Sequence, residues 1–188
     1  MSKTFFDVLG VPRAFHLDAP ALEAQLRALS KQFHPDRFAK AAPHERMVAL
    51  QRTTELNDAY RVLKDPVKRA EYLLKLEGID VADERSAQVK APPSLLAEVL
   101  ELNESLADAR LAHDRGQVEA LAAEVRARRE RAMRAVDEGF GAFEKGDRST
   151  LGSVAEALVA MRYHARFLEQ VEGFAELEAR EPSPVGDR

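Results

Sequence analysis

Apolar side chains recur at helical spacing in the first part of the chain. One stripe follows steps of four, three and four residues: Leu22, Leu26, Leu29 and Phe33. A second stripe repeats the pattern further on: Ala49, Thr53, Leu56, Tyr60 and Leu63. Such spacing predicts two helices, the first capped by Asp18, that bury their stripes against each other as an antiparallel pair. Apolar groups at 5–9 and 72–74 predict short helices that close the ends of the pair.

Three long helices are predicted beyond residue 94. The inward positions of the first follow a regular four-three seam: Leu95, Val99, Leu102, Leu106 and Ala109. The middle helix has its own seam, interrupted by Arg129: Val118, Ala122, Val125, Ala132, Val136, Phe140 and Phe143. The last helix has another: Val154, Leu158, Met161, Ala165 and Leu168. Since no segment alternates apolar and polar residues as a strand does, the predicted fold is all-α.

Helical periodicity is lost between the two groups of helices. The segment IDVADERSAQVKAPP ends in two prolines, Pro92 and Pro93, which cannot continue a helix. We therefore predict a first domain over 1–78, a linker over 79–93 and a second domain over 94–180. The last residues, 181–188, hold two prolines and a glycine and are predicted to be a flexible tail.

Composition narrows the classes of function. The 188 residues are 45% hydrophobic and 32% charged, and no apolar run approaches the roughly 18 residues of a membrane span. Without cysteine, disulfides and thiolate metal sites are excluded. Residues 1–80 carry a net charge of +2 and residues 81–188 one of −6, so neither part has the basic surplus of a nucleic-acid binder. The missing targeting segment favours a bacterial cytoplasm.

The tripeptide His34-Pro35-Asp36 sits between the first two long helices. Proline disfavours helical backbone in the preceding residue and has no N–H to donate, so the first helix must end at or just before His34. We expect a fixed, exposed corner that presents Asp36 and the following Arg37. On the helix that leads to it, Arg27 and Lys31 lie about 140° and 180° from the start of the buried stripe, where they form a small basic face.

The first helix of the predicted bundle has apolar residues outside its seam. Leu96 and Leu100 lie about 100° and 140° from Leu95, outside the seam. The same face continues with small and acidic residues: Ala97, Glu101, Glu104 and Asp108. On the last helix Phe167 lies about 100° from Leu168, away from most of its seam. The surplus predicts a protein-binding face; the alternative is that these apolar side chains pack within the chain.

Together these segments resemble a known family. The order of TFFDVLGVP, QFHPDRF and LNDAYRVLKDPVKRAEYLL is similar to a J-domain. The continuation of RAEYLL into a second domain resembles the HscB-type co-chaperones of iron–sulfur cluster assembly. LLAEVLELNESL and MRYHARFLEQV are similar, less specifically, to that family's scaffold-binding helices. The resemblance covers nearly the whole chain and implies an N-terminal J-domain followed by a C-terminal three-helix scaffold-binding domain.

The resemblance implies two protein partners and no catalytic site in this chain. The residues that would engage a DnaK/HscA-type chaperone and stimulate its ATP hydrolysis are His34, Pro35, Asp36, Arg27, Lys31 and Arg37. The residues that would bind an IscU-type iron–sulfur cluster scaffold protein, which the co-chaperone delivers, are Leu96, Ala97, Leu100, Glu101, Glu104, Asp108 and Phe167.

Other chemistry has less support in the sequence. His34 and Asp36 have neither a nucleophile nor a phosphate-binding loop beside them. Four other histidines lack ligand spacing, so we predict solvated or capping roles for them and no metal or cofactor: His16, His44, His113 and His164. Two alternatives remain open: a general J-protein that delivers unfolded clients, and a helical adaptor whose J-like domain has lost its partner.

Overall fold

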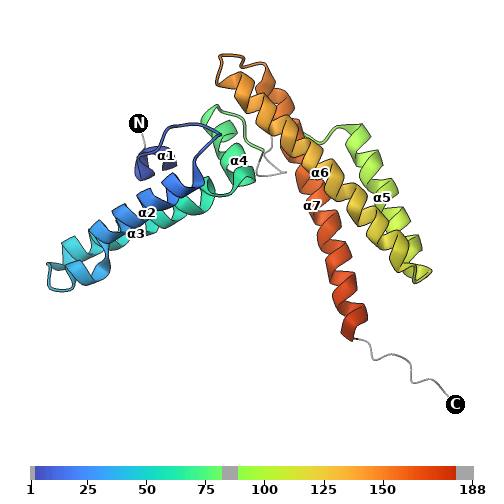
Figure 1. Ribbon diagram of the computed structural model, residues 1–188, viewed down its shortest axis with the longest axis horizontal. Coiled ribbons are helices and arrows are strands. Elements are labelled where there is room, and N and C mark those ends of the chain that lie inside the picture. Colours follow the sequence, from blue (N-terminus) through green and yellow to red (C-terminus); the bar gives the residue numbers. More distant parts are fainter. Residues whose placement is uncertain (1–2, 82–88, 181–188) are drawn as a thin grey trace. The chain divides into compact units, whose positions relative to one another are not determined.

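The computed structural model describes residues 3–81 and 89–180, and within these ranges every regular element is helical (Figure 1). The elements are α1 (Phe5–Leu9), α2 (Ala19–Phe33), the 3-10 turn η1 (Pro35–Phe38), α3 (Pro43–Leu63), α4 (Pro66–Leu76), α5 (Pro93–Leu111), α6 (Arg115–Phe143) and α7 (Thr150–Arg180). The predicted all-α class is confirmed. None of these helices is long and apolar enough to span a bilayer.

The chain divides into two compact units, Met1–Ile79 and Asp80–Arg188. Most of the predicted linker, 82–88, and the predicted tail, 181–188, lie outside the described residues. Each unit is described separately below.

The first unit is built on the pairing of α2 with α3, as predicted. Asp18 caps α2, because its Oδ1 accepts the backbone N–H of Ala21 at 3.2 Å. Leu22 on α2 is buried, and α3 contributes four buried positions, Ala49, Leu56, Ala59 and Leu63. Leu22, Ala49, Leu56 and Leu63 of the predicted stripes therefore lie in a small core, while their other members, Leu26, Leu29, Phe33, Thr53 and Tyr60, are half-buried.

Short helices close the ends of this pair. Phe6 and Leu9 of α1 are buried, and the Tyr72 ring of α4 stacks on Phe5 with the centroids 4.6 Å apart. The Tyr72 hydroxyl also accepts the backbone N–H of Phe5 at 2.9 Å. An ion pair of 2.6 Å between Arg13 and Glu77 joins the loop after α1 to the end of α4. The two ends of the unit's sequence are thus tied to each other.

The second unit is the predicted three-helix bundle of α5, α6 and α7. The most extensive contact is between α6 and α7, which approach each other closely at Gly139. A Cβ atom at Gly139 would lie 2.3 Å from Cγ2 of Val154, so only glycine permits this separation. The Thr150 hydroxyl donates to the Gly139 carbonyl at 2.9 Å, which fixes the approach at the start of α7.

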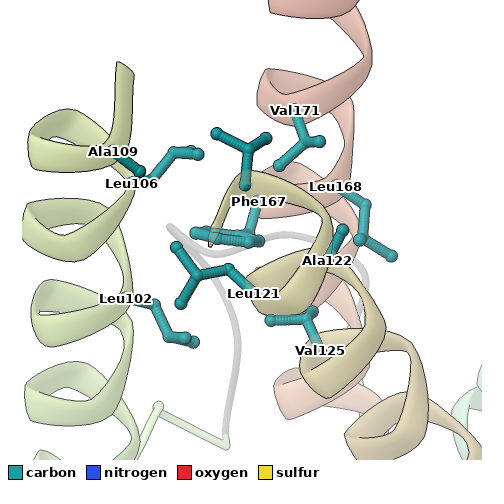
Figure 2. Packing of buried hydrophobic residues seen from close by; sticks show 10 residues of the cluster. Leu102, Leu106, Ala109, Leu121, Ala122, Val125, Phe167, Leu168 and Val171 are labelled. Atoms are coloured by element: carbon teal, nitrogen blue, oxygen red, sulfur yellow. The ribbon is translucent and has the colours of Figure 1, made fainter. Parts of the chain in front are cut away.

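The core between the three helices includes Phe167, which corrects one prediction. Phe167 is 1% exposed, and its ring lies among side chains of α5, α6 and α7 (Figure 2). The cluster also contains Leu102, Leu106, Ala109, Val118, Leu121, Ala122, Val125, Leu168 and Val171. The expectation that Phe167 lies at the surface is wrong, because α7 packs against both neighbours here and buries a wider arc than a single seam.

A polar cluster around the buried His164 joins the same three helices and corrects a second prediction. His164 of α7 is 4% exposed, not solvated, and its Nε2 lies 3.0 Å from Oε1 of Glu98 on α5. Arg128 of α6 pairs with the same carboxylate and, at 2.6 Å, with Glu124. Burial raises the pKa of Glu98, but the hydrogen bonds from His164 and Arg128 outweigh it and leave the pKa lowered.

Candidate functional site

The corner at His34–Asp36 is held by its own backbone. Helix α2 ends at Phe33, and Pro35 opens the single turn η1, as the proline rules predict. The backbone N–H of Arg37 donates to the His34 carbonyl at 3.0 Å. The Arg37 guanidinium donates to the Lys31 carbonyl at 3.3 Å, which ties the turn back to the last turn of α2.

The corner presents the side chains of His34 and Asp36 to solvent. The side chain of Asp36 is 89% exposed and that of His34 is 58% exposed. The backbone N–H of Asp36 donates to Nδ1 of His34 at 3.3 Å, so this nitrogen acts as an acceptor. A neutral His34 therefore carries its proton on Nε2, where it can donate to a partner. His34 offers an N–H and Asp36 offers a carboxylate, and both are fixed by one turn.

The basic residues lie where the sequence places them. Arg27, Lys31 and Arg37 are all exposed. Arg27 is 2.7 Å from Glu23, one turn earlier, so part of its charge is offset within α2. The net positive charge near the corner is therefore carried mainly by Lys31 and Arg37.

The predicted apolar and acidic face on α5 is exposed. Leu96 and Leu100 are 46% and 59% exposed, whereas Leu95 and Leu102, in the seam, are buried. Four smaller or acidic members of the face are also exposed: Ala97, Glu101, Glu104 and Asp108. We call these six residues the α5 face. It holds every predicted scaffold-binding residue except Phe167, which belongs to the core.

A hollow beside the α5 face involves a residue that sequence reasoning missed. Leu96 lines a hollow of about 260 Å³ together with Tyr163 of α7 and the chain at Val89–Ala91. Tyr163 is half-buried and lies one helical turn before Phe167. An aromatic residue of α7 therefore does border this surface, but it is Tyr163. The helical angle of Phe167 alone could not distinguish the two.

The described residues contain no group of three or more His, Asp or Glu side chains that could hold a metal ion. The corner belongs to the first unit and the α5 face to the second. What both surfaces offer is exposed hydrogen-bonding, charged and apolar groups. Such arrangements recognise other proteins.

Comparisons with known proteins agree with this division. Residues 4–72 match a family model described as DnaJ domain, and residues 91–172 match one described as HSCB C-terminal oligomerisation domain. A co-chaperone protein HscB homolog of Vibrio cholerae is 47% identical over 102 residues, an alignment that covers 54% of this chain and 58% of that protein. One of Burkholderia thailandensis is 36% identical over 172 residues, which cover 92% of this chain and 96% of the homologue.

A solved structure gives the same result in three dimensions. The chaperone HscB from Vibrio cholerae superimposes with a TM-score of 0.75 at 31% identity, covering 94% of this chain and 99% of that one. The fold and the exposed corner define a J-domain protein with a helical C-terminal domain. The chain belongs to the HscB family of co-chaperones. Its relatives are named as co-chaperones and not as enzymes.

Proposed function

We propose that this protein is a co-chaperone of iron–sulfur cluster assembly that stimulates a DnaK/HscA-type chaperone ATPase and delivers an IscU-type scaffold protein to it. The observation that carries the proposal is the corner, where His34 and Asp36 are exposed and fixed by one turn. The family supports it, because the relatives are named co-chaperones. They come from the bacteria Vibrio and Burkholderia, and we place the activity in the bacterial cytoplasm.

The corner can contact a partner surface that has a cationic or N–H donor group for Asp36 and acidic groups nearby for the basic residues. Asp36 offers an unburied carboxylate, and the neighbouring Lys31 and Arg37 attract acidic groups. A contact that is stronger in the hydrolysis-competent conformation of the chaperone shifts its population toward that conformation. Stimulation then needs no catalytic group from this chain.

The α5 face suits a partner with an apolar patch edged by basic residues. Leu96 and Leu100 supply the apolar anchors, while Glu101, Glu104 and Asp108 supply the acidic edge. A scaffold protein bound there is carried on the same chain as the corner. Tethering both surfaces raises the local concentration of the scaffold at the chaperone.

The corner is tested by single-turnover ATP hydrolysis on the chaperone, with the intact protein added. Asp36→Asn removes the carboxylate charge but keeps its size, and it is expected to abolish stimulation without moving the thermal midpoint, since the side chain is exposed. Asp58→Asn, on α3 of the same unit, is the matched control and should stimulate fully. Full stimulation by Asp36→Asn would disprove the proposed mechanism.

The α5 face is tested by titrating the scaffold protein against the chain. Replacing Leu96 and Leu100 together with Ala should weaken binding at least about thirtyfold, the effect of losing roughly 2 kcal/mol from even one central apolar anchor. Leu111→Ala is the matched control, since Leu111 is 82% exposed at the end of α5 but outside the face. Equal affinities for the double variant and the control would exclude this face from scaffold binding.

The description of the matched C-terminal model favours a second candidate for the same face, contact with another copy of the chain. Sedimentation of the protein alone separates the two. Self-association that is lost with the Leu96 and Leu100 changes would assign the face to a second copy. A monomer that binds the scaffold protein supports the first candidate.

A further inference from the structure

The first unit contains an apolar hollow next to the corner, and the proposed function does not account for it. The hollow has a volume of about 190 Å³ and is lined by Phe33, Phe38, His44, Glu45, Val48 and Ala49. Phe33 is the last residue of α2 and Phe38 the last of η1, so the two rings border the His34–Asp36 corner on either side in the sequence. We call it the corner hollow.

Its wall is apolar and accessible. Phe33 and Phe38 are half-buried, Val48 is 42% exposed, and the buried Ala49 forms the floor. The carboxylate of Glu45 accepts the backbone N–H of Ala42 at 3.0 Å, so it is engaged at the start of α3. The hollow therefore presents hydrocarbon at a position where the surface around it is charged.

Hydrogen bonds also hold the backbone on either side of the hollow. The Thr53 hydroxyl of α3 lies 2.9 Å from the Ala49 carbonyl of its own helix and 3.2 Å from the Phe33 carbonyl at the end of α2. At the other side, the Phe38 carbonyl accepts the backbone N–H of Ala41 at 2.9 Å. A preformed hollow binds a side chain at a lower entropic cost than one that must be ordered first.

We propose that the corner hollow receives one apolar side chain of the chaperone ATPase, so that the J-domain contact has an apolar anchor beside its polar one. This inference rests on the proposed function, because the occupant is the chaperone that the corner engages. Phe33 directly precedes His34, and Phe38 follows Asp36 by two residues, so a surface that engages both His34 and Asp36 lies close to the backbone of both rings. The contact with the corner is thus continuous with the hollow.

Size and charge specify the occupant. A cavity of about 150 Å³ is large enough for a benzene molecule, so the hollow has room for one large aliphatic side chain or a ring, and not for a helix. Three exposed basic residues, Lys31, Arg37 and Lys40, lie on the segment that borders it. The fitting surface therefore has an apolar residue flanked by carboxylates.

The test compares two apolar residues of α3 in the intact protein. Val48→Gln places a polar, longer side chain in the hollow. Leu50→Gln is the matched control, because Leu50 is 62% exposed and does not line the hollow. It lies about 160° around the helix from Val48. Both positions are exposed, so neither change should move the thermal midpoint. Val48→Met, which keeps the side chain apolar, is the conservative variant.

The readout is the concentration of the protein that gives half-maximal stimulation of the chaperone's single-turnover ATP hydrolysis. Val48→Gln should raise it about tenfold or more, the effect of removing an apolar anchor, while maximal stimulation is retained because the corner is intact. Leu50→Gln and Val48→Met should stay within about threefold of the unchanged protein. This pattern supports the inference.

Three results would overturn the inference, and one separates it from the proposed function. A half-maximal concentration for Val48→Gln equal to that of Leu50→Gln means that the hollow is empty in the complex. An equal loss for Val48→Met shows that the position has no requirement for an apolar side chain. Self-association lost in Val48→Gln assigns the hollow to a second copy. In each case the proposed function is tested separately by Asp36→Asn. If that variant no longer stimulates ATP hydrolysis, the proposed function still stands although the inference about the hollow fails.

Discussion

Replacing Phe167 with alanine is expected to destabilise the bundle of α5, α6 and α7 by about 3 to 5 kcal/mol. The ring is 1% exposed, so its full transfer into the core is worth about 1.5 to 3 kcal/mol. Its loss also leaves a cavity, and each 50 Å³ that does not collapse adds roughly 1.2 kcal/mol. Collapse is limited here because the ring contacts side chains from three helices, as Figure 2 shows.

Urea denaturation measures this loss. With a slope of about 1 to 3 kcal/mol per molar, a change of 3 kcal/mol lowers the midpoint by roughly 1 M or more. Hydrogen exchange localises the effect, because amide protection should fall in α6 and α7 and stay unchanged in α2 and α3. Leu100→Ala is the control: at 59% exposure it should change stability by less than about 0.5 kcal/mol.

The opposite result has a definite meaning. If Phe167→Ala unfolds at the same urea concentration as the unchanged protein and yet loses affinity for the scaffold protein, Phe167 is a surface anchor. The argument from its burial would then be refuted, and the original expectation from the sequence would be right.

Two further predictions concern the bundle. Gly139→Ala should lower the thermal midpoint although alanine favours helices, because its Cβ cannot fit against α7; Gly141→Ala, where nothing lies within 4 Å, should instead stabilise by about 0.5 to 1 kcal/mol. Glu98→Gln should cost about 1 to 3 kcal/mol at neutral pH by weakening the contacts with Arg128 and His164. The pKa of Glu98 is lower in the folded state than its ordinary 4.5. The difference in unfolding free energy between the unchanged protein and Glu98→Gln should therefore be largest above pH 4.5 and disappear as the pH falls through the lowered pKa. Urea midpoints measured across this pH range check it.

The elements that could be predicted from the sequence are those set by local rules. Apolar spacing predicted the pairing of α2 with α3 and the buried positions Leu102 and Leu106, because these positions recur at helical steps along their own helices. Proline chemistry placed the end of α2 before His34, because no tertiary contact is needed for that rule. The exposure of Leu96 and Leu100 followed from the same angles.

The errors fall on α7, which meets two neighbours. A single seam of about 100° describes a helix that packs on one surface, so residues beyond it were expected to be exposed. Phe167 and His164 lie beyond the seam on the side where α5 covers α7. The spacing of residues within α7 does not show that a second helix, α5, covers that side. The signal that was present is the size of Phe167, since a large ring seldom lies uncovered.

The corner hollow could not be predicted for a different reason. Its wall comes from three elements, α2, η1 and α3, and its residues are spread from Phe33 to Ala49. Its apolar members, Phe33, Phe38, Val48 and Ala49, are ordinary apolar residues when each is taken in its own helix. A hollow exists only through the distances between elements, which the spacing of residues within an element does not determine.

The polar cluster explains why α5 turns one set of leucines inward and another outward. The hydrophobic effect does not depend on direction, so it does not by itself fix how α5 is rotated about its axis. Apolar residues stand side by side at 95 and 96 and again at 99 and 100, and a rotation of about 100° would still bury apolar surface. A carboxylate with two specific donors is directional. The same rotation would carry Glu98 away from both Arg128 and His164, so the half-buried carboxylate would lose both partners and the buried His164 would lose its hydrogen bond. The cluster therefore favours the rotation that exposes Leu96 and Leu100, so the face proposed to bind the scaffold protein depends on a half-buried polar cluster that is not part of that face.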